Sequence, residues 1–170
     1  MAILRITKQG EPVLKKPSAP VDFEAMKDEL PKLLKDMWAT MYSVKGVGLA
    51  APQIGLNIRL SVIDVRPDGK AQKLVLINPE IVSREGVIHD EEGCLSLPGV
   101  YAKIDRAAKV RIRALDAAGR PYEMEGQGLL ARAFQHEIDH LDGKLFIDHL
   151  DFVHKLRVMA IVKDLKPSWS

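Results

Sequence analysis

The chain lacks several features that would place it in a special class of protein. It has a single cysteine, Cys94, so no internal disulfide can form. The net charge is only +2, which gives no reason to expect a nucleic-acid or anionic-membrane partner. No apolar run approaches the roughly 18 residues of a membrane-spanning helix. The N-terminal segment also lacks a charged stretch followed by an apolar core, so we expect no secretory signal and a reducing, cytoplasmic setting.

The length and composition that remain are those of one ordinary globular domain. The hydrophobic fraction is 46% and the charged fraction 28%, both usual for a soluble protein. A chain of 170 residues is long enough for one core and too short for two. We therefore expect residues 1–170 to form a single domain.

The segment from Gly128 to Leu145 contains the pattern H-E-x-x-H, with His136, Glu137 and His140. Residues four apart lie on the same face of a helix, so both imidazoles can bind one metal ion, with Glu137 beside them to act on a bound water. Five-residue patterns also arise by chance, and Glu137 would then be a solvated surface charge. The apolar residues from Leu129 to Phe134 favour a buried helix instead, where this cluster would be costly without a metal.

The third metal ligand decides the chemistry, and the usual peptidase solutions fit poorly. The extended pattern H-E-x-x-H-x-x-G-x-x-H is matched through Gly143, but Phe146 stands where the last histidine should be. A downstream carboxylate, Asp164, lies among lysines near the end of an amphipathic segment, and we interpret it as a surface charge.

Cys94 is the alternative third ligand. A lone cysteine is more often a small buried hydrophobe. Gly93 before it and Pro98-Gly99 after it make a plain core strand a poor description, so we expect Cys94 in a loop of its own. A thiolate with two imidazoles suits zinc or ferrous iron, and the ligand set alone does not choose between them.

Strands grouped ahead of the main helix are typical of an α+β fold. We expect mostly antiparallel strands packed around a central metal-binding helix, with an N-terminal and a C-terminal helix. Asp22 is a candidate N-cap for the N-terminal helix, and Pro31 predicts a kink or restart near residue 30. The other predicted elements are a strand or ordered arm at Ile3–Thr7, strands at Arg59–Val65, Lys73–Asn78, Ile81–Ile88, Lys109–Leu115 and Tyr122–Glu125, a short strand at Lys144–Ile147, and a closing helix at Asp151–Lys166.

Three blocks together resemble the peptide deformylase family. They are Gly46–Gln53 (GVGLAAPQ), Glu92–Ser96 (EGCLS) and His136–His140 (HEIDH), and the resemblance spans nearly the whole chain. It implies a single catalytic domain over residues 1–170. It also implies an amide hydrolase that removes the N-formyl group from the initiator methionine of new polypeptides and releases formate.

The resemblance also assigns roles at the reacting centre. It implies that Cys94, His136 and His140 bind one ferrous ion, which zinc, nickel or cobalt can replace, and that Glu137 is the general base and acid. The developing oxyanion would be held by the metal and two donors, and the substrate by backbone and apolar side chains. The two donors are the Gln53 side-chain amide and the Leu95 backbone N–H. Substrate contacts are assigned to Val47, Gly48, Gly93, Leu129 and Ala133.

Some expectations at the edge of the site rest on single residues. Gln53 also has a simpler interpretation, as a loop residue bonded to nearby backbone. Leu129 fits ordinary core packing as well as a pocket wall. Tyr101 stands where some family members have arginine, which leaves the substrate contacts at the rim open. Arg106 is a candidate partner for Glu92, a pair that would hold the cysteine segment.

The expected partners are N-formyl-methionyl nascent peptides. The basic residues of the C-terminal helix have two interpretations: a solvated face, which is the simpler one, and a surface for transient contact with the ribosome. We expect no recognition of a nucleic-acid sequence, no membrane association, and a monomer. The basic residues are Lys155, Arg157, Lys163 and Lys166.

Two rival functions use the same helix. A zinc peptidase would need a third ligand other than Cys94. A non-catalytic domain with a structural metal would need four protein ligands. Neither His89, His149 nor His154 is an obvious fourth ligand, and we interpret the last two as surface residues.

Overall fold

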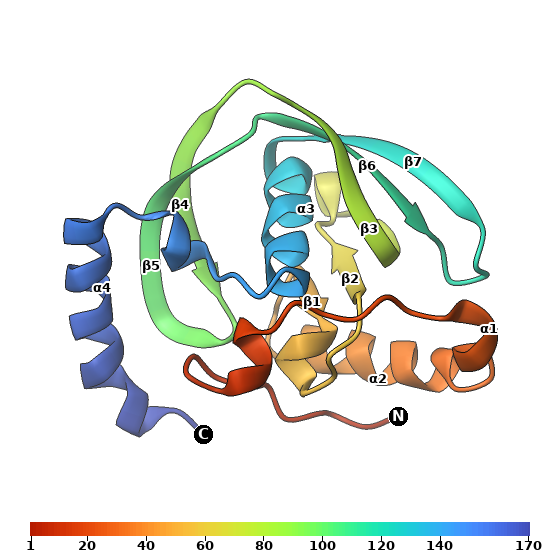
Figure 1. The fold of residues 1–170 in the computed structure, drawn as a ribbon, viewed down its shortest axis with the longest axis horizontal. Helices are drawn as coiled ribbons and strands as arrows, with labels where there is room; N and C mark the ends of the chain where they lie inside the picture. The colour runs from red at the N-terminus through yellow and green to blue at the C-terminus, as the bar shows by residue number, and fades with distance from the viewer.

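The computed structural model describes all of residues 1–170, and it places one helix at the centre of two antiparallel sheets (Figure 1). The larger sheet has the strand order β1-β2-β3-β6-β7, and β4 and β5 form a separate two-stranded hairpin. The predicted α+β fold is confirmed. The strands are β1 Gly48–Ala50, β2 Leu60–Asp64, β3 Lys73–Glu85, β4 Ile88–Cys94, β5 Leu97–Arg106, β6 Lys109–Leu115 and β7 Pro121–Gln127, and the helices are α1 Phe23–Met26, α2 Leu30–Ser43, α3 Gly128–Leu141 and α4 Phe152–Leu165.

The central helix is α3, and the strands of the larger sheet curve around it (Figure 1). Phe134 is completely buried, and Ile138, one turn further on, is almost so. Both pack against Val110 and Ile112, which alternate along β6 with exposed residues. Because the apolar face of α3 is held by the sheet, its remaining faces are free to carry polar side chains toward β4 and β1.

The N-terminal helix divides where Pro31 predicts a restart. Asp22 caps α1 by accepting a hydrogen bond from the Ala25 backbone N–H at 3.2 Å, and α2 begins at Leu30 with the proline in its first turn. Ile3–Thr7, predicted as a strand or an ordered arm, is an ordered arm. Its Thr7 N–H donates a hydrogen bond to the Gln53 carbonyl at 2.8 Å. This arm connects the N-terminus to the neighbourhood of the site.

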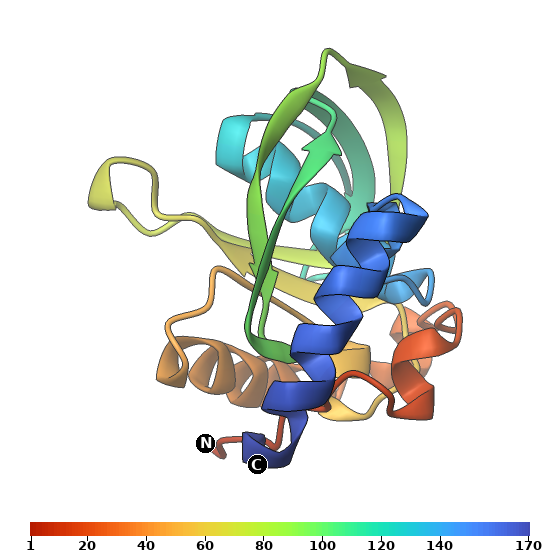
Figure 2. The same cartoon turned by 90° about the vertical axis from the view of Figure 1, so that its left-hand side faces the viewer.

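The C-terminal helix α4 lies on the outer face of the β4–β5 hairpin (Figure 2). Asp151 caps it through the His154 backbone N–H at 2.9 Å, and α4 ends at Leu165, two residues before Pro167. Its buried residues Val158 and Val162 pack in one cluster with residues of β5. The helix thus fixes the hairpin that carries Cys94.

Three secondary-structure predictions are wrong in detail. Ile81–Ile88 is not a strand of its own, because it begins within β3, which continues past two irregularities in its pairing with β6 to Glu85. The chain then turns at Gly86, where φ is +69°. β5 was not predicted, since Pro98-Gly99 near its start reads as a turn. Lys144–Ile147 is not a strand, because its last two residues begin a 3-10 turn at Phe146–His149. A 2.8 Å hydrogen bond from the Leu145 N–H to the Asp148 carboxylate stabilises this turn.

Two element ends lie at the site, and the one at Cys94 differs from the prediction. The predicted central helix is α3, which ends at Leu141, and Gly143 follows with φ +76°. Cys94 does not lie in a loop of its own, because it is the last residue of β4 and pairs with Leu97 across a two-residue turn. A strand end places the cysteine more rigidly than a loop would.

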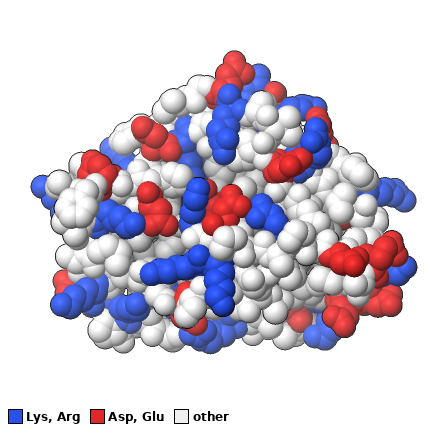
Figure 3. Space-filling view, viewed as in Figure 1, with Lys and Arg blue, Asp and Glu red and all other residues white.

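No helix combines the length and the apolar character needed to cross a bilayer. On the face shown in Figure 3, positive and negative side chains are interspersed over most of the surface. That distribution agrees with the small net charge of +2.

Candidate metal centre

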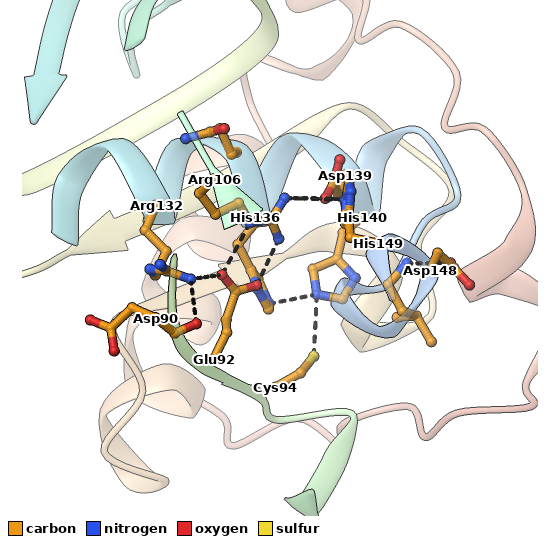
Figure 4. Close-up of polar contacts among 12 residues, drawn as sticks. Asp90, Glu92, Cys94, Arg106, Arg132, His136, Asp139, His140, Asp148 and His149 are labelled. Atoms are coloured by element: carbon orange, nitrogen blue, oxygen red, sulfur yellow. Dashed lines mark hydrogen bonds and ion pairs between the residues drawn. The ribbon is translucent and has the colours of Figure 1, made fainter. Parts of the chain in front are cut away.

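Two elements bring the three predicted metal ligands together (Figure 4). His136 and His140 lie one turn apart on α3, and Cys94 reaches them from the end of β4. The two histidine Nε2 atoms are 3.2 Å apart, and the Cys94 Sγ lies 3.4 Å from His140 Nε2. Potential ligand atoms of all three residues lie within 4.8 Å of one another.

These distances fit a small metal ion. Zinc and similar ions bind imidazole nitrogen at about 2.0–2.1 Å and thiolate at about 2.3 Å, so tetrahedral ligand atoms sit about 3.3–3.6 Å apart. The three side chains also suit such an ion chemically. Burial raises the pKa of the Cys94 thiol, but the charge of His140 and the hydrogen bond with His136 outweigh it and lower the pKa to about 5. The cysteine is therefore a thiolate at neutral pH, which is the form that binds metals.

Glu92 orients the first histidine. The His136 Nδ1 atom lies 2.6 Å from a Glu92 carboxylate oxygen, and this hydrogen bond leaves Nε2 to face the other two ligands. Burial opposes ionisation of Glu92, yet the hydrogen bonds from His136 and Arg106 hold its pKa well below the usual glutamate range. The opposite ring nitrogen of the second ligand, His140 Nδ1, is buried without a hydrogen-bond partner.

The predicted pair of Arg106 and Glu92 is present and buried. Arg106 donates from Nη2 and Nε to the two oxygens of Glu92, at 2.6 and 3.1 Å. It also donates to Asp139 on α3 at 2.6 Å, so one guanidinium connects β4 to the metal-ligand helix. Arg132 adds a further bond to Glu92 at 2.9 Å, and His149 lies 2.7 Å from Asp139 (Figure 4).

Glu137 lies beside the ligands on a buried stretch of α3. One carboxylate oxygen accepts a hydrogen bond from the Ser61 hydroxyl at 3.2 Å, and the other lies against the backbone of Gly48. Burial raises the pKa of Glu137, while the neighbouring histidines oppose that effect only in part. A carboxylate with a raised pKa suits proton transfer near neutral pH.

Gln53 also lies at the ligand cluster. Its side-chain oxygen accepts from the Ala50 N–H at 3.0 Å, and its Nε2 lies 3.2 Å from the Ser96 hydroxyl and 3.6 Å from the Cys94 Sγ. The backbone bond of the simpler interpretation is therefore present, and so is an amide N–H group directed at the cysteine. Leu95 is the first residue of the turn after Cys94, and its half-buried side chain packs against Gly46.

The ligand cluster opens into a cleft of about 940 Å³. Leu129 belongs to the cleft rather than to the core, because 53% of its side chain is exposed, while Ala133 is buried at its wall. Tyr101 is 63% exposed and lies over Gly93. All five predicted substrate-contact residues line this cleft: Val47, Gly48, Gly93, Leu129 and Ala133.

Two polar residues of the site were not found from the sequence. Ser61, which is bonded to Glu137, is a fully buried polar residue between the apolar Leu60 and Val62 of β2, and that contrast was a usable signal. Ser96 is fully buried beside Gln53, and the spacing of the cysteine block gave no sign of its contact. Of the remaining histidines, His89 pairs with Asp105 at 2.7 Å and neither it nor His154 belongs to the metal cluster.

A half-buried thiolate, two helix-borne imidazoles and an adjacent glutamate define a metal-dependent hydrolase of the H-E-x-x-H type. The family model described as polypeptide deformylase matches residues 3–156. A peptide deformylase of Alkalilimnicola ehrlichii is 50% identical, over 97% of this chain and 92% of that protein, and one of Elusimicrobium minutum is 47% identical over 100% of both.

The fold gives the same result. The crystal structure of a peptide deformylase from Legionella pneumophila superposes with a TM-score of 0.90 and 46% identity, covering 98% of this chain and 96% of the other. The chain belongs to the polypeptide deformylase family.

Proposed function

We propose that this protein is a peptide deformylase, which hydrolyses the N-formyl group of formyl-methionyl polypeptides and releases formate. The observation that carries the proposal is the meeting of Cys94, His136 and His140 beside Glu137, at the base of a cleft open to a peptide. Membership of the deformylase family supports this reaction, and the buried Glu137 can serve as its general base. We propose that residues 1–170 form one catalytic domain.

The ligand set accepts a ferrous ion, which we propose as the native metal, with zinc, nickel or cobalt as substitutes. When bound, the metal supplies an activated water near neutral pH and polarises the carbonyl under attack. Cys94, His136 and His140 hold it, and Glu92 keeps the ring of His136 turned toward it.

Glu137 moves the proton in the proposed reaction. Its carboxylate takes a proton from the attacking water and delivers it to the leaving amine of methionine. Ser61 donates to one carboxylate oxygen, which fixes the side chain and leaves the other oxygen beside Gly48. The raised pKa lets the same group accept and return a proton near neutral pH.

The oxygen of the formyl carbonyl becomes negative as the water attacks. Two donors near Cys94 suit this charge: the Gln53 side-chain amide and the Leu95 backbone N–H. Loss of one such donor typically costs about 2.7–4 kcal/mol of transition-state stabilisation. Gln53 is 1% exposed and fastened through Ala50, so its amide requires little reorganisation when the charge appears.

The methionine side chain enters the apolar part of the cleft, between Leu129 and Ala133. The substrate backbone lies extended against Val47 and Gly48, at the outer edge of the larger sheet, and against Gly93 on β4. β1 is paired only with β2, so its other side is free to accept an added strand.

The setting of the reaction follows from its substrate. We propose a cytoplasmic monomer that meets nascent chains and contacts the ribosome only transiently through α4. The basic residues Arg157 and Lys163 are exposed on this helix, whereas Lys155 is engaged with Asp148 at 2.8 Å. We propose no recognition of a nucleic-acid sequence and no membrane association.

The decisive experiment is anaerobic purification with metal analysis, together with an assay of formate release from a formyl-Met peptide. We expect about one metal per chain and turnover with the iron form. Cys94→Ser should lose or severely weaken metal binding and abolish formate release. A zinc peptidase with another third ligand would keep its metal and its peptidase activity after the same change. Ser83→Ala, which changes an exposed residue of β3 outside the cleft, is a neutral control. Absence of formate release by the iron-loaded protein would contradict the proposed function.

A further inference from the structure

The cleft is larger than a formyl-methionyl group requires. Its volume of about 940 Å³ is near the upper end of the roughly 300–1,000 Å³ usual for sites that bury a whole drug-sized ligand. It extends beyond Leu95, away from the helix that carries the metal ligands, to the N-terminal arm and the segment after α4. The lining of this far part includes Ile6, Lys8, Val44, Lys45, Pro98 and Trp169.

The far part has an ordered aromatic floor. The Trp169 Nε1 donates to the Pro98 carbonyl at 3.0 Å, and the indole packs against the cluster formed by β5 and α4. The segment before it is also held, because Lys166 reaches the Gln9 side chain at 3.3 Å. Figure 2 shows the end of α4 beside the turn that joins β4 and β5. The indole is half-buried, so part of its surface remains available.

The direction of β1 indicates what enters this part of the cleft. Gly48 lies against Glu137, so a substrate with its formyl group at the metal ligands begins there. Leu49 and Ala50 are fully buried, which closes the path along β1 in that direction. The open path runs the other way, over Val47, which is 42% exposed, to Lys45.

The spacing of an extended chain then sets which substrate residues reach the indole. Lys45 lies three positions before Gly48, so the two are at most about 10 Å apart at roughly 3.3 Å per residue, and the turn at Lys45, where φ is +56°, shortens that distance. A peptide that begins at Gly48 and continues over Val47 therefore has its third or fourth residue near Lys45, and the next residues enter the part of the same cleft that Trp169 lines. The environment there is apolar, with the cationic side chains of Lys8 and Lys45 at its edge.

We infer that Trp169 forms a subsite for the fourth and fifth residues of the substrate, and that this subsite favours apolar or aromatic side chains. The inference rests on the proposed deformylase function. The occupant is the downstream part of the same nascent peptide, because the far part of the cleft is continuous with the site that holds its formyl end. Trp169 touches no reacting atom, so it acts on substrate binding rather than on the chemical step.

The test compares formyl-Met-Ala-Ser with two hexapeptides that extend it, one with Phe and one with Gly at positions four and five. We expect kcat/KM to be about tenfold higher for the Phe hexapeptide than for the Gly hexapeptide, with the difference in KM and not in kcat. In Trp169→Ala the ratio should fall to about 1. In the control Ile161→Ala, which changes an exposed apolar residue of α4 outside the cleft, it should stay near ten.

A measurement on the wild-type protein makes the test independent of how well the variant folds. A hexapeptide with a photoreactive phenylalanine at position five should label Trp169, Pro98 or their neighbours, and labelling confined to another surface would overturn the inference. Equal kcat/KM for the two hexapeptides, or a ratio that survives in Trp169→Ala, would also overturn it. Failure of the proposed function looks different, since formyl-Met-Ala-Ser itself would then release no formate.

Discussion

The carboxylate of Glu92 binds the Nδ1 of His136 at 2.6 Å, and this contact connects the first metal ligand to the surrounding fold. Arg106 and Arg132 fix the same carboxylate from two further directions. Arg106 in turn connects Glu92 to Asp139, which lies beside the second histidine in sequence. The position of the His136 ring is thereby set by β4, β5 and α3 together.

Replacing Glu92 by glutamine should lower metal affinity by about 10–100-fold, because an amide is a weaker acceptor for His136 and cannot neutralise the two arginines. The measurement is competition with a chelator of known affinity. Glu85→Gln, whose side chain is 77% exposed at the end of β3, is the control and should bind metal as the wild type does. Equal affinities for Glu92→Gln and the wild type would show that the contact is only structural.

Glu137→Gln should reduce kcat for formate release by about 10²–10⁴-fold while metal content stays near the wild-type value. The amide keeps the shape of the side chain and its contact with Ser61 but cannot accept the proton. In the wild type, burial raises the pKa of Glu137, so activity should decline on the acid side through a pKa above the ordinary value of about 4.3. A variant with full activity would exclude Glu137 as the base.

Gly48→Ala should impair catalysis without removing the metal. A Cβ at this position would lie 2.9 Å from the Glu137 Cδ, so the carboxylate must shift. A displacement of even about 1 Å can cost about 100-fold in rate, and we expect kcat to fall between tenfold and that value. Rate and metal content are measured on the same preparation. An unchanged kcat would mean that Glu137 can move without consequence.

Tyr122 should make stability depend on pH above neutrality. Burial, with a smaller contribution from Asp116, raises its pKa to about 12, and its hydroxyl donates to the Val75 carbonyl at 2.7 Å. The unfolded chain loses this proton near pH 10. The stabilisation is therefore complete below pH 10 and is lost as the pH rises through about 12.

Tyr122→Phe tests this relationship. Below pH 10 the variant should be less stable than the wild type by about 1 kcal/mol, the usual net value of one hydrogen bond. Between pH 10 and 12 the difference should shrink, because only the wild type has this proton to lose. Denaturant unfolding of both proteins at several pH values measures it. A constant difference across that range would contradict the assignment.

Much of the site was predictable because its signals are short-range. Two histidines four residues apart must share a helix face, so the pair of ligands on α3 followed directly from the spacing. Asp22 and Pro31 likewise act within one turn of where they stand, and both boundaries were correct. The fold class followed from the order of strands and helices.

Features that depend on contacts between segments distant in the chain could not be predicted from these local signals. Pro98-Gly99 is a typical turn sequence, so β5 was not expected there. The strand is stable because Ile104 and its neighbours are buried against α4. Cys94 looked like a loop residue, yet pairing with β5 makes it the end of a strand. Ser61 and Glu137 are far apart in the chain, and only packing brings them to 3.2 Å.

The sequence by itself determined which side chains form the centre, since helix periodicity gives two ligands and the base, and the three blocks give Cys94 and Gln53. The tertiary structure alone decided how they are held. The bonds that connect Glu92 to His136 and Arg132, and the reach of the cleft to Trp169, join segments that are distant in the chain. Local spacing constrains only neighbours within a turn or a strand pair, whereas such contacts depend on how the sheets and α3 pack.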